Sequence, residues 1–154
     1  MAEFNISLEN DIVEYYGEKV VFGTIEIGDF KEVFHASLSY WDRGYYLYQW
    51  KIALERIFNG EASTAIVSCM YHPEKSNFLF WWPIYVVGDD VIFHNQSLNF
   101  NLCSPPFDES SMHKSIDDRV AELEEGEDRP SEWKTTMLAL KEFYNRNLVD
   151  VELE

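Results

Sequence analysis

Residues 64–96 read TAIVSCMYHPEKSNFLFWWPIYVVGDDVIFHNQ. Two apolar runs, Thr64–Tyr71 and Phe78–Val87, flank a polar loop, and a Gly-Asp turn leads from the second run into a third, Asp90–Gln96. Runs of this length that are bounded by turn residues are typical of strands. The sequence therefore predicts a meander of three antiparallel strands. Pro83 lies in the second strand, and because proline has no N–H to donate, we expect that strand at a sheet edge or at a bulge.

Upstream of this meander, the apolar period changes between Asp42 and Gly60. Apolar side chains recur there at spacings of three and four residues, on one face of a helix: Tyr46, Trp50, Ala53, Leu54, Ile57 and Phe58. Asp42 suits the N-cap and Gly60 the C-terminal stop. Before this helix, Val20–Ile27 and Phe30–Leu38 are joined by Gly28-Asp29 and predict a hairpin whose turn needs a positive φ at its first residue.

The flanking segments complete the order of elements. Ser104-Pro105-Pro106 ends the sheet region, and a short helix is expected around Ile116–Leu123. Ser131 suits the N-cap of a second long helix. Its apolar stripe is Trp133, Met137, Leu140 and Tyr144. The form of residues 4–16 is left open. This order predicts an α+β fold, in which one or two twisted antiparallel sheets carry two main helices on one face, and residues 1–154 form a single domain.

The charge balance is strongly acidic. The 154 residues contain 28 Asp and Glu against 12 Lys and Arg, a formal net charge of -16. Because 46% of the residues are hydrophobic, this is no disordered acidic tail but a folded domain with a negative field. Such a field repels phosphates and attracts basic proteins. The composition therefore favours a protein that binds a cationic partner.

Seven acids cluster late in the chain, and two more lie at a turn. The cluster is Asp117, Asp118, Glu122, Glu124, Glu125, Glu127 and Asp128, with Arg119 as the only basic residue among them. The second patch is Asp89 and Asp90. A solvated acidic loop explains the cluster as well as partner binding does, so both interpretations stay open. These nine acids are the candidate binding residues.

No constellation for catalysis or metal binding accompanies the acids. The four histidines are scattered: His35, His72, His94 and His113. No nucleophile elbow, phosphate-binding loop or CxxC motif is present. Gly88-Asp89-Asp90 is more typical of a hairpin turn than of a metal site, and the acidic cluster lacks the EF-hand spacing. Paired carboxylates such as Glu26 and Glu32 on neighbouring strands are the weakest alternative. We therefore expect no enzyme, no cofactor and no metal.

The cysteines and the start of the chain bear on location. Cys69 lies in an apolar run and is expected to be a small core side chain, while a disulfide with Cys103 stays open. No stretch approaches the roughly 20 apolar residues of a membrane span, and residues 1–11 lack a basic n-region. The sequence predicts a soluble, cytoplasmic protein without a membrane partner.

The abundant aromatic side chains allow two interpretations. The run Phe78–Trp82 could stack bases, but base stacking accompanies a basic groove, so core packing is favoured for it. Aromatic residues near the first helix are candidate interface anchors, since Tyr and Trp are enriched at such positions. They are Tyr40, Trp41, Tyr45, Tyr46 and Tyr48.

A set of aromatic and turn residues resembles a known family. The set is Leu38-Ser39-Tyr40-Trp41, Tyr48-Gln49-Trp50, Phe58-Asn59-Gly60, Thr64-Ala65, Met70-Tyr71, Pro73-Glu74-Lys75, Asn77-Phe78, Trp82, Val91, Asn95-Gln96 and Ser131-Glu132-Trp133. From about Leu38 to Tyr144 it resembles the immunity proteins of bacterial contact-dependent growth inhibition systems. The resemblance implies a Whirly-like fold of two roughly perpendicular antiparallel sheets with helices, and it transfers no binding residue.

The same resemblance implies a function. Such a protein protects its own cell by binding the C-terminal toxin domain of a surface-delivered effector, and it acts by occlusion rather than catalysis. Relatives with this pattern pair with a nuclease toxin directed at ribosomal RNA. An RNase presents a basic cleft that an acidic protein can cap, so charge and resemblance agree. We expect a monomer or a toxin–immunity heterodimer that binds no nucleic acid. The alternatives are an acidic adaptor and a single-stranded nucleic-acid-binding module.

Overall fold

The first sheet is antiparallel and contains the N-terminal strands. The computed structural model describes residues 3–103, 106–119 and 131–153. The strands of this sheet are β1 (Phe4–Leu8), β2 (Val13–Tyr15), β3 (Glu18–Ile27) and β4 (Phe30–Ser37), and β3 pairs with each of the other three. Gly28 in the β3–β4 turn has φ 60°, which confirms the predicted hairpin. Residues 4–16, whose form the sequence left open, supply β1 and β2.

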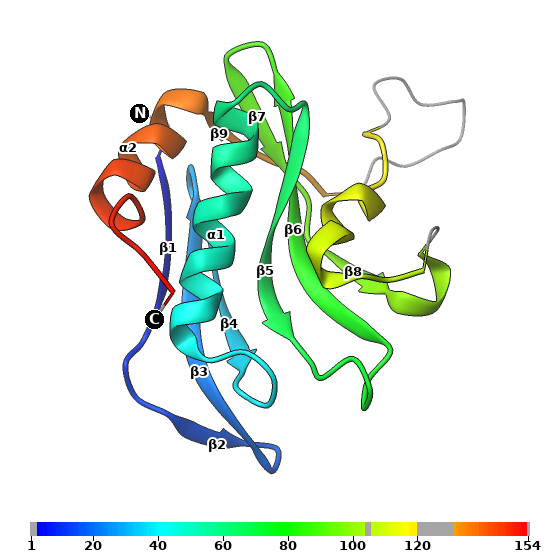
Figure 1. Cartoon of the computed structure of the whole chain (residues 1–154). Helices are drawn as coiled ribbons and strands as arrows, with labels where there is room; N and C mark the ends of the chain where they lie inside the picture. Colours follow the sequence, from blue (N-terminus) through cyan, green and yellow to red (C-terminus); the bar gives the residue numbers. More distant parts are fainter. Residues whose placement is uncertain (1–2, 104–105, 120–130, 154) are drawn as a thin grey trace.

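The second antiparallel sheet contains the meander. Its strands are β5 (Ser63–Met70), β6 (Phe78–Val87), β7 (Asp90–Phe93), β8 (Gln96–Asn99) and β9 (Trp133–Thr136). They follow the order β5-β6-β7-β9, and β8 pairs with the other half of β6. The three predicted strands are therefore present, but the third ends at Phe93 and a separate strand begins at Gln96. The predicted α+β fold with two antiparallel sheets is confirmed (Figure 1).

The expectation that Pro83 marks an edge strand or a bulge is wrong. β6 is a central strand, with β5 on one side and β7 and β8 on the other. The Pro83 carbonyl accepts a hydrogen bond from the His94 N–H (2.9 Å), so the proline nitrogen faces the same side, where the partner strand changes from β8 to β7. Proline is tolerated because it lies where the ladder is already interrupted. The register shift in the β5–β6 pair lies elsewhere, between Val67 and Cys69.

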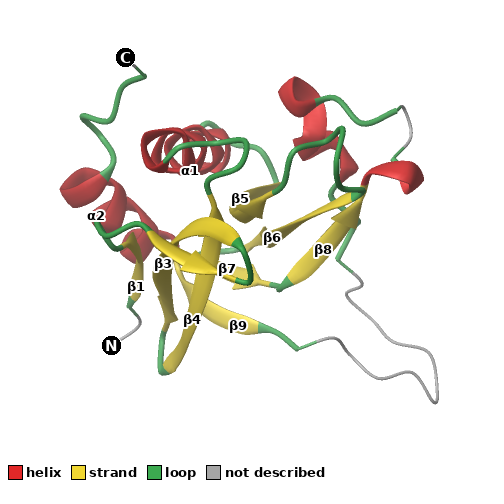
Figure 2. Ribbon diagram, turned by 90° about the horizontal axis from the view of Figure 1, so that it is seen from below, coloured by secondary structure: helices red, strands yellow, loops and turns green. Residues whose placement is uncertain are grey.

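Helical segments lie along one side of the strands (Figure 2). They are α1 (Arg43–Phe58), the 3-10 segments η1 (Phe100–Leu102) and η2 (Glu109–Ser115), and α2 (Met137–Asn147). Helix α1 begins after Asp42, whose side chain accepts from the Tyr45 N–H (2.8 Å), as the predicted N-cap requires. The helix expected around Ile116–Leu123 is wrong for residues 116–119, which are not helical, and its remainder lies outside the described residues.

The second long helix begins later than predicted. Ser131 does not cap it, because Trp133–Thr136 form β9 and pair with β7. Threonine and tryptophan favour strands, and the Thr136 hydroxyl accepts from the Ala139 N–H (3.1 Å) as the N-cap of α2. The apolar spacing that suggested an earlier start therefore crosses a strand–helix junction.

Helix α1 covers the free edge of β5 with its side chains. Gln49 Nε2 donates to the Ala65 carbonyl (2.9 Å), and Gln49 Oε1 accepts from the Val67 N–H (2.8 Å). Trp50 Nε1 donates to the Val67 carbonyl (2.7 Å). These bonds satisfy backbone groups that a further strand would otherwise pair. They also fix α1 against the sheet along one wall of the site described below.

Aromatic side chains join the layers of the core. Phe4 of β1 stacks on Phe93 of β7 with 5.2 Å between ring centroids, and it meets Phe143 of α2 edge-on at 5.1 Å. Both sheets and α2 therefore meet at one ring. Trp81 and Trp82 are buried, which confirms core packing for them. Phe78 and Phe80 are each 37% exposed, so core packing is wrong for these two. In the described ranges, no helix is both long and apolar enough to cross a membrane.

Candidate partner-binding surface

Two of the seven clustered acids lie within the described structure. Asp117 and Asp118 follow η2 and are exposed, and the Asp117 carbonyl accepts from the Tyr85 hydroxyl (2.7 Å). Burial, followed by the charges of Asp117 and Asp118, raises the pKa of Tyr85 to about 12. The other five lie outside the described residues: Glu122, Glu124, Glu125, Glu127 and Asp128. The cluster thus begins against β6, and its role in binding stays a prediction.

The second acidic patch occupies the β6–β7 turn. Gly88 has φ 64°, and Asp89 follows it in a two-residue turn that closes at Asp90, which confirms the predicted hairpin. The Asp89 carbonyl accepts from the Met137 N–H (2.9 Å). The Asp90 carboxylate lies 3.8 Å from the Lys134 ammonium, so one of the two charges has a cationic neighbour. The binding role of this patch also stays a prediction.

An ion-paired carboxylate joins the two ends of the acidic segment. Arg119 donates from Nε (2.7 Å) and Nη2 (3.0 Å) to Glu132, and Glu132 lies 2.9 Å from Nε2 of the buried His94. The amide of Gln96 lies 3.2 Å from the other ring nitrogen of His94. The hydrogen bonds to Glu132 raise the pKa of Arg119 above its ordinary value. We name Arg119, Glu132 and His94 the Glu132 network.

A second carboxylate is held by neutral donors. Glu109 in η2 accepts from the Tyr40 hydroxyl (2.9 Å) and from the Trp41 indole N–H (2.8 Å). The hydrogen bond to Glu109 is the largest cause of a raised pKa at Tyr40. In the described ranges, no Lys, Arg or His nitrogen lies within 4.0 Å of this carboxylate. The negative charge of Glu109 is therefore held in place without being neutralised.

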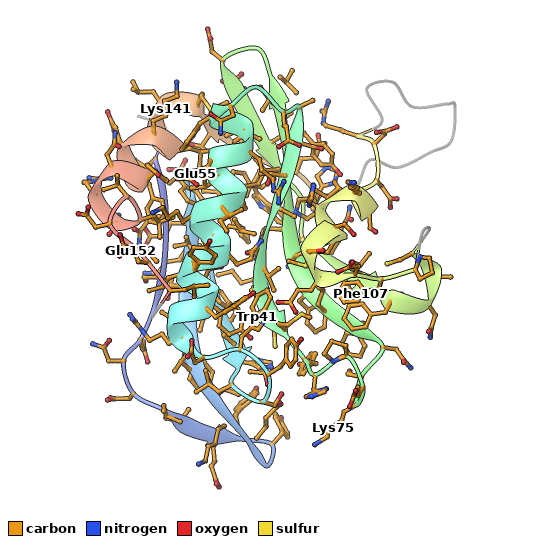
Figure 3. The ribbon with its side chains drawn as sticks, viewed as in Figure 1. Trp41, Glu55, Lys75, Phe107, Lys141 and Glu152 are labelled. Atoms are coloured by element: carbon orange, nitrogen blue, oxygen red, sulfur yellow. The ribbon has the colours of Figure 1, made fainter. Side chains whose placement is uncertain are left out.

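A cavity of about 430 Å³ opens beside Glu109, between α1, β5 and η2. Its aromatic walls are Trp41, Tyr45, Tyr48 and Trp81. Thr64 also lines the cavity and is fully buried, and its hydroxyl has no hydrogen-bond partner among the described residues. In Figure 3, Trp41 lies beside the first turn of α1. We name this cavity, with Glu109 at its side, the Glu109 pocket.

The other end of the Glu109 pocket is basic. Arg56 Nη1 lies 3.1 Å from His113 Nε2 and 3.9 Å from the Glu61 carboxylate. Burial, and then the charge of Arg56, lowers the pKa of His113, so this ring is neutral at neutral pH and accepts from Arg56. Eleven positions separate Tyr45 from Arg56 on α1, about 16 Å of helical rise. The pocket therefore has an acidic, aromatic side at Glu109 and Tyr45 and a basic side at Arg56 and His113.

Comparison with known proteins identifies the family of this chain. Residues 36–143 match the family model of the CdiI N-terminal domain. The chain belongs to the CdiI family of immunity proteins. Immunity protein CdiI of Enterobacter cloacae subsp. cloacae is 31% identical over 142 residues, which cover 92% of this chain and 97% of that protein. The predicted resemblance to immunity proteins of contact-dependent growth inhibition systems is confirmed.

A solved structure supports the same family. It is the CdiA-CT/CdiI toxin and immunity complex from Enterobacter cloacae, in which the matching chain has a TM-score of 0.83 and 30% sequence identity to this one. The match covers 93% of this chain and 97% of that chain. The similarity to this structure therefore covers a larger share of the chain than residues 36–143 of the family model.

Two of the five aromatic residues expected as interface anchors are buried in this CdiI-family protein. Tyr46 is 0% exposed and Trp41 is 4% exposed. The Tyr46 hydroxyl donates to the Ser37 carbonyl (2.6 Å) and accepts from the Met70 N–H (2.9 Å). These contacts make Tyr46 part of the core, so its expected role as an exposed anchor is wrong. The other three are at least partly exposed: Tyr40, Tyr45 and Tyr48.

The described residues do not show the geometry expected for a paired-carboxylate enzyme or for a metal site. Glu26 lies opposite Lys31 and Glu32 lies opposite Ile25 in the β3–β4 ladder, so the two glutamates point to opposite faces of the sheet. In the part of the chain that the structure describes, no three His, Cys, Asp or Glu side chains are grouped as a metal site requires. Both cysteines are free thiols, and Cys69 is buried as expected.

Proposed function

We propose that this protein is the immunity partner of a contact-dependent growth inhibition toxin. It binds the C-terminal toxin domain in the cytoplasm of its own cell and blocks it by covering the active-site region. The observation that carries the proposal is the similarity, at a TM-score of 0.83, to a chain solved in a toxin and immunity complex. Occlusion requires a complementary surface and no catalytic group of its own, which fits a chain without a catalytic motif.

We further infer that the toxin is an RNase with a basic cleft. A net charge of -16 supports this inference, because a protein that cleaves a polyanion presents cations to it, and an acidic inhibitor imitates the charge of that substrate. Asp89, Asp117 and Asp118 contribute exposed negative charge. The remaining acids of the cluster add to it along the sequence. The same field opposes binding of nucleic acid by the immunity protein itself.

Calorimetric titration tests this proposal directly. The purified C-terminal domain encoded by the gene immediately upstream, where we expect the toxin gene to lie, is titrated with the immunity protein at low and at high salt. We expect nanomolar binding that weakens as salt rises, because exposed charges are screened, together with loss of RNA cleavage in the same mixture. Absence of binding at both salt concentrations would overturn the toxin-partner proposal. Binding without any RNA cleavage by the free toxin would overturn the RNase inference alone.

A matched pair of charge reversals tests the acidic surface. Asp117→Lys with Asp118→Lys reverses two charges beside β6, while Glu142→Lys with Asp150→Lys makes the same change in net charge on α2 and the C-terminal tail. All four carboxylates are exposed. We expect about tenfold weaker binding at low salt for the first pair and less than a twofold change for the second. Equal losses would show that net charge, rather than this surface, sets the affinity.

A further inference from the structure

The Glu109 pocket has the features of a binding site for a cationic group. We propose that it receives a lysine or arginine side chain of the partner protein, with Glu109 as counter-charge and Tyr45 and Tyr48 as walls. This inference rests on the proposed function, because it names a contact through which the toxin would be held. It adds to the acidic cluster a second binding point at Glu109, eight positions before Asp117 in the sequence.

The charge of Glu109 is available to a partner. Its carboxylate is positioned by the Tyr40 hydroxyl and the Trp41 indole, both neutral donors, and a hydrogen bond from a neutral group orients an anion without cancelling its field. Exposed Asp108 adjoins it and accepts from the Ser110 N–H (3.0 Å) and hydroxyl (2.9 Å). Two adjacent carboxylates held by neutral groups therefore give this end of the pocket a negative potential.

The rings beside Glu109 suit a cation. Trp41 and Tyr45 have 4.9 Å between ring centroids, and Tyr45 and Tyr48 have 6.3 Å, so the three aromatics form a continuous wall along the first turns of α1. A Lys or Arg group within about 6 Å of such a ring is attracted by the electron-rich face, and more strongly when it is desolvated. The long aliphatic stem of either side chain packs well on the same rings.

Thr64 is an independent feature of the pocket, because its buried hydroxyl has no partner among the described residues. A buried hydroxyl without a partner is destabilising, and such groups are rare in folded proteins. The Thr64 hydroxyl is one of these, and it lines the pocket. Lys and Arg carry only hydrogen-bond donors, which a hydroxyl oxygen can accept. The cavity of about 430 Å³ lies within the size range of ordinary ligand sites.

The basic residues of the pocket determine where in it a cationic group can bind. Arg56 repels a cation, but its guanidinium lies 3.9 Å from the Glu61 carboxylate and contacts His113, four positions after Glu109 in η2. His113 is neutral at neutral pH because burial and Arg56 lower its pKa. A cationic group is therefore drawn to the Glu109 carboxylate, while Thr64 lines the same pocket.

Three single substitutions test the pocket by calorimetric titration with the upstream-encoded toxin domain. Glu109→Gln removes the charge but keeps both hydrogen bonds, since an amide oxygen accepts from the indole and an amide NH₂ donates to the tyrosine hydroxyl. We expect about 30-fold weaker binding for it. Thr64→Val keeps the shape and removes the hydroxyl, and we expect about fivefold weaker binding.

Glu55→Gln is the matched control. Glu55 lies on the opposite flank of α1, toward α2, where it accepts from the Tyr144 hydroxyl at 2.5 Å (Figure 3). It therefore repeats the same substitution on the same helix, at a carboxylate also held by tyrosine, and binding should change less than twofold. Wild-type affinity in Glu109→Gln and Thr64→Val would overturn the pocket proposal while leaving toxin binding established. An equal loss in all three variants would overturn it as well.

A second measurement separates failure of the pocket from failure of the toxin-partner proposal. If the wild-type protein does not bind the toxin domain, the proposed function fails, and the pocket is tested with Nα-acetyl-L-arginine amide as probe. We expect the indole N–H resonance of Trp41 to shift saturably in the wild type and to stay fixed in Glu109→Gln. The indole of Trp50, buried on the Val67 carbonyl (2.7 Å), is the internal reference. No shift at Trp41 would overturn the pocket proposal without reference to any toxin.

Discussion

Glu132 and Glu109 are both glutamates that accept hydrogen bonds from side chains distant in sequence, but their donors differ in charge. Glu132 accepts from the guanidinium of Arg119 and lies beside His94, whereas Glu109 accepts from Tyr40 and Trp41. A guanidinium cancels most of the field of a carboxylate, and a hydroxyl or an indole does not. The first arrangement is therefore suited to holding the chain together, and the second to attracting a cation.

The surroundings of the two carboxylates differ in the same direction. The Glu132 side chain is 16% exposed and links Arg119, near the start of the acidic cluster, to the chain that follows the cluster. Glu109 borders a cavity with aromatic walls and an unpaired buried hydroxyl at Thr64. The number of hydrogen bonds that a carboxylate accepts therefore does not show whether it is structural or binds a partner. The charge of its donors and the presence of a cavity beside it distinguish the two roles. Identical substitutions at the two sites can therefore separate their roles.

The largest expected effect on stability is that of Glu132→Gln. Both carboxylate oxygens of Glu132 accept hydrogen bonds in the folded protein. In the glutamine one of them is replaced by an NH₂ group, which would face a nitrogen donor of Arg119 or His94 without a hydrogen bond between them. We expect a loss of about 2 kcal/mol in the free energy of unfolding. Glu109→Gln should change it by less than about 0.5 kcal/mol, because the Tyr40 hydroxyl can turn and accept. Urea denaturation of both variants measures the contrast, and equal losses would contradict it.

The next effect concerns the rates of toxin binding. Reversing exposed Asp117 and Asp118 should lower the association rate constant about tenfold at low salt, with little effect at high salt, since such charges act mainly by steering. Glu109→Gln should instead raise the dissociation rate constant at either salt, because its contact forms only in the docked complex. Stopped-flow association and displacement measurements distinguish the two. A salt-dependent association defect in Glu109→Gln would place Glu109 among the steering charges instead.

The sequence predicted the locally determined parts of the fold. Helix α1 was identified from its apolar period and its Asp42 cap, and two hairpin turns from Gly-Asp pairs that adopt positive φ at glycine. Strand β9 was mistaken for helix because its partner, β7, lies about 40 positions earlier in the chain. The alternation of Phe4, Ile6 and Leu8, all buried, is a local strand signal for β1.

The candidate site was less accessible to sequence reasoning. Acid density correctly marks where charge is concentrated, but it does not show which acids are compensated. Trp41 and Glu109 are 68 positions apart, so only the fold brings them together. Arg119 offered one signal, as the single basic residue in the acidic cluster, and its partner Glu132 lies 13 positions away. Arg119 is therefore a local signal for the Glu132 network, and the aromatic residues near the first helix, among them Tyr45 and Tyr48, are a local signal for the Glu109 pocket.

A smaller effect on stability is expected at Thr64, where the unpaired hydroxyl should destabilise the folded protein. Thr64→Val should raise the free energy of unfolding by about 1 kcal/mol, because it removes a buried polar group without a partner. Thr135→Val is the matched control, since Thr135 is also buried but its hydroxyl donates to the Glu3 carbonyl (2.9 Å). That variant should lose about 1 kcal/mol. Denaturant midpoints at equal m-values measure both, and a loss in Thr64→Val would indicate that its hydroxyl has a partner.

The last expected effect appears only at alkaline pH, and it distinguishes the Asp117–Asp118 region, reported by Tyr85, from the Glu109 pocket, reported by Tyr40. Tyr85 has a folded-state pKa of about 12, above its ordinary value of 10.0, so the unfolded chain releases this proton first as the pH rises. The stability that Tyr85 contributes is therefore complete below pH 10 and is lost between about pH 10 and 12. Tyr85→Phe should flatten the decline of the free energy of unfolding in this window, as measured by denaturant titration at several pH values.

The pKa values of Tyr85 and Tyr40 report independently on the Asp117–Asp118 region and on the Glu109 pocket. Asp117→Asn with Asp118→Asn should lower the pKa of Tyr85 only in part, because burial is the larger cause of the shift and remains. Glu109→Gln should leave the pKa of Tyr85 unchanged and lower that of Tyr40, whose shift arises mainly from its hydrogen bond to Glu109. NMR titration of the tyrosine ring carbons measures both in one experiment. A change at Tyr85 in Glu109→Gln would mean that the two regions are electrostatically coupled, and that neither can be assigned a separate part in binding.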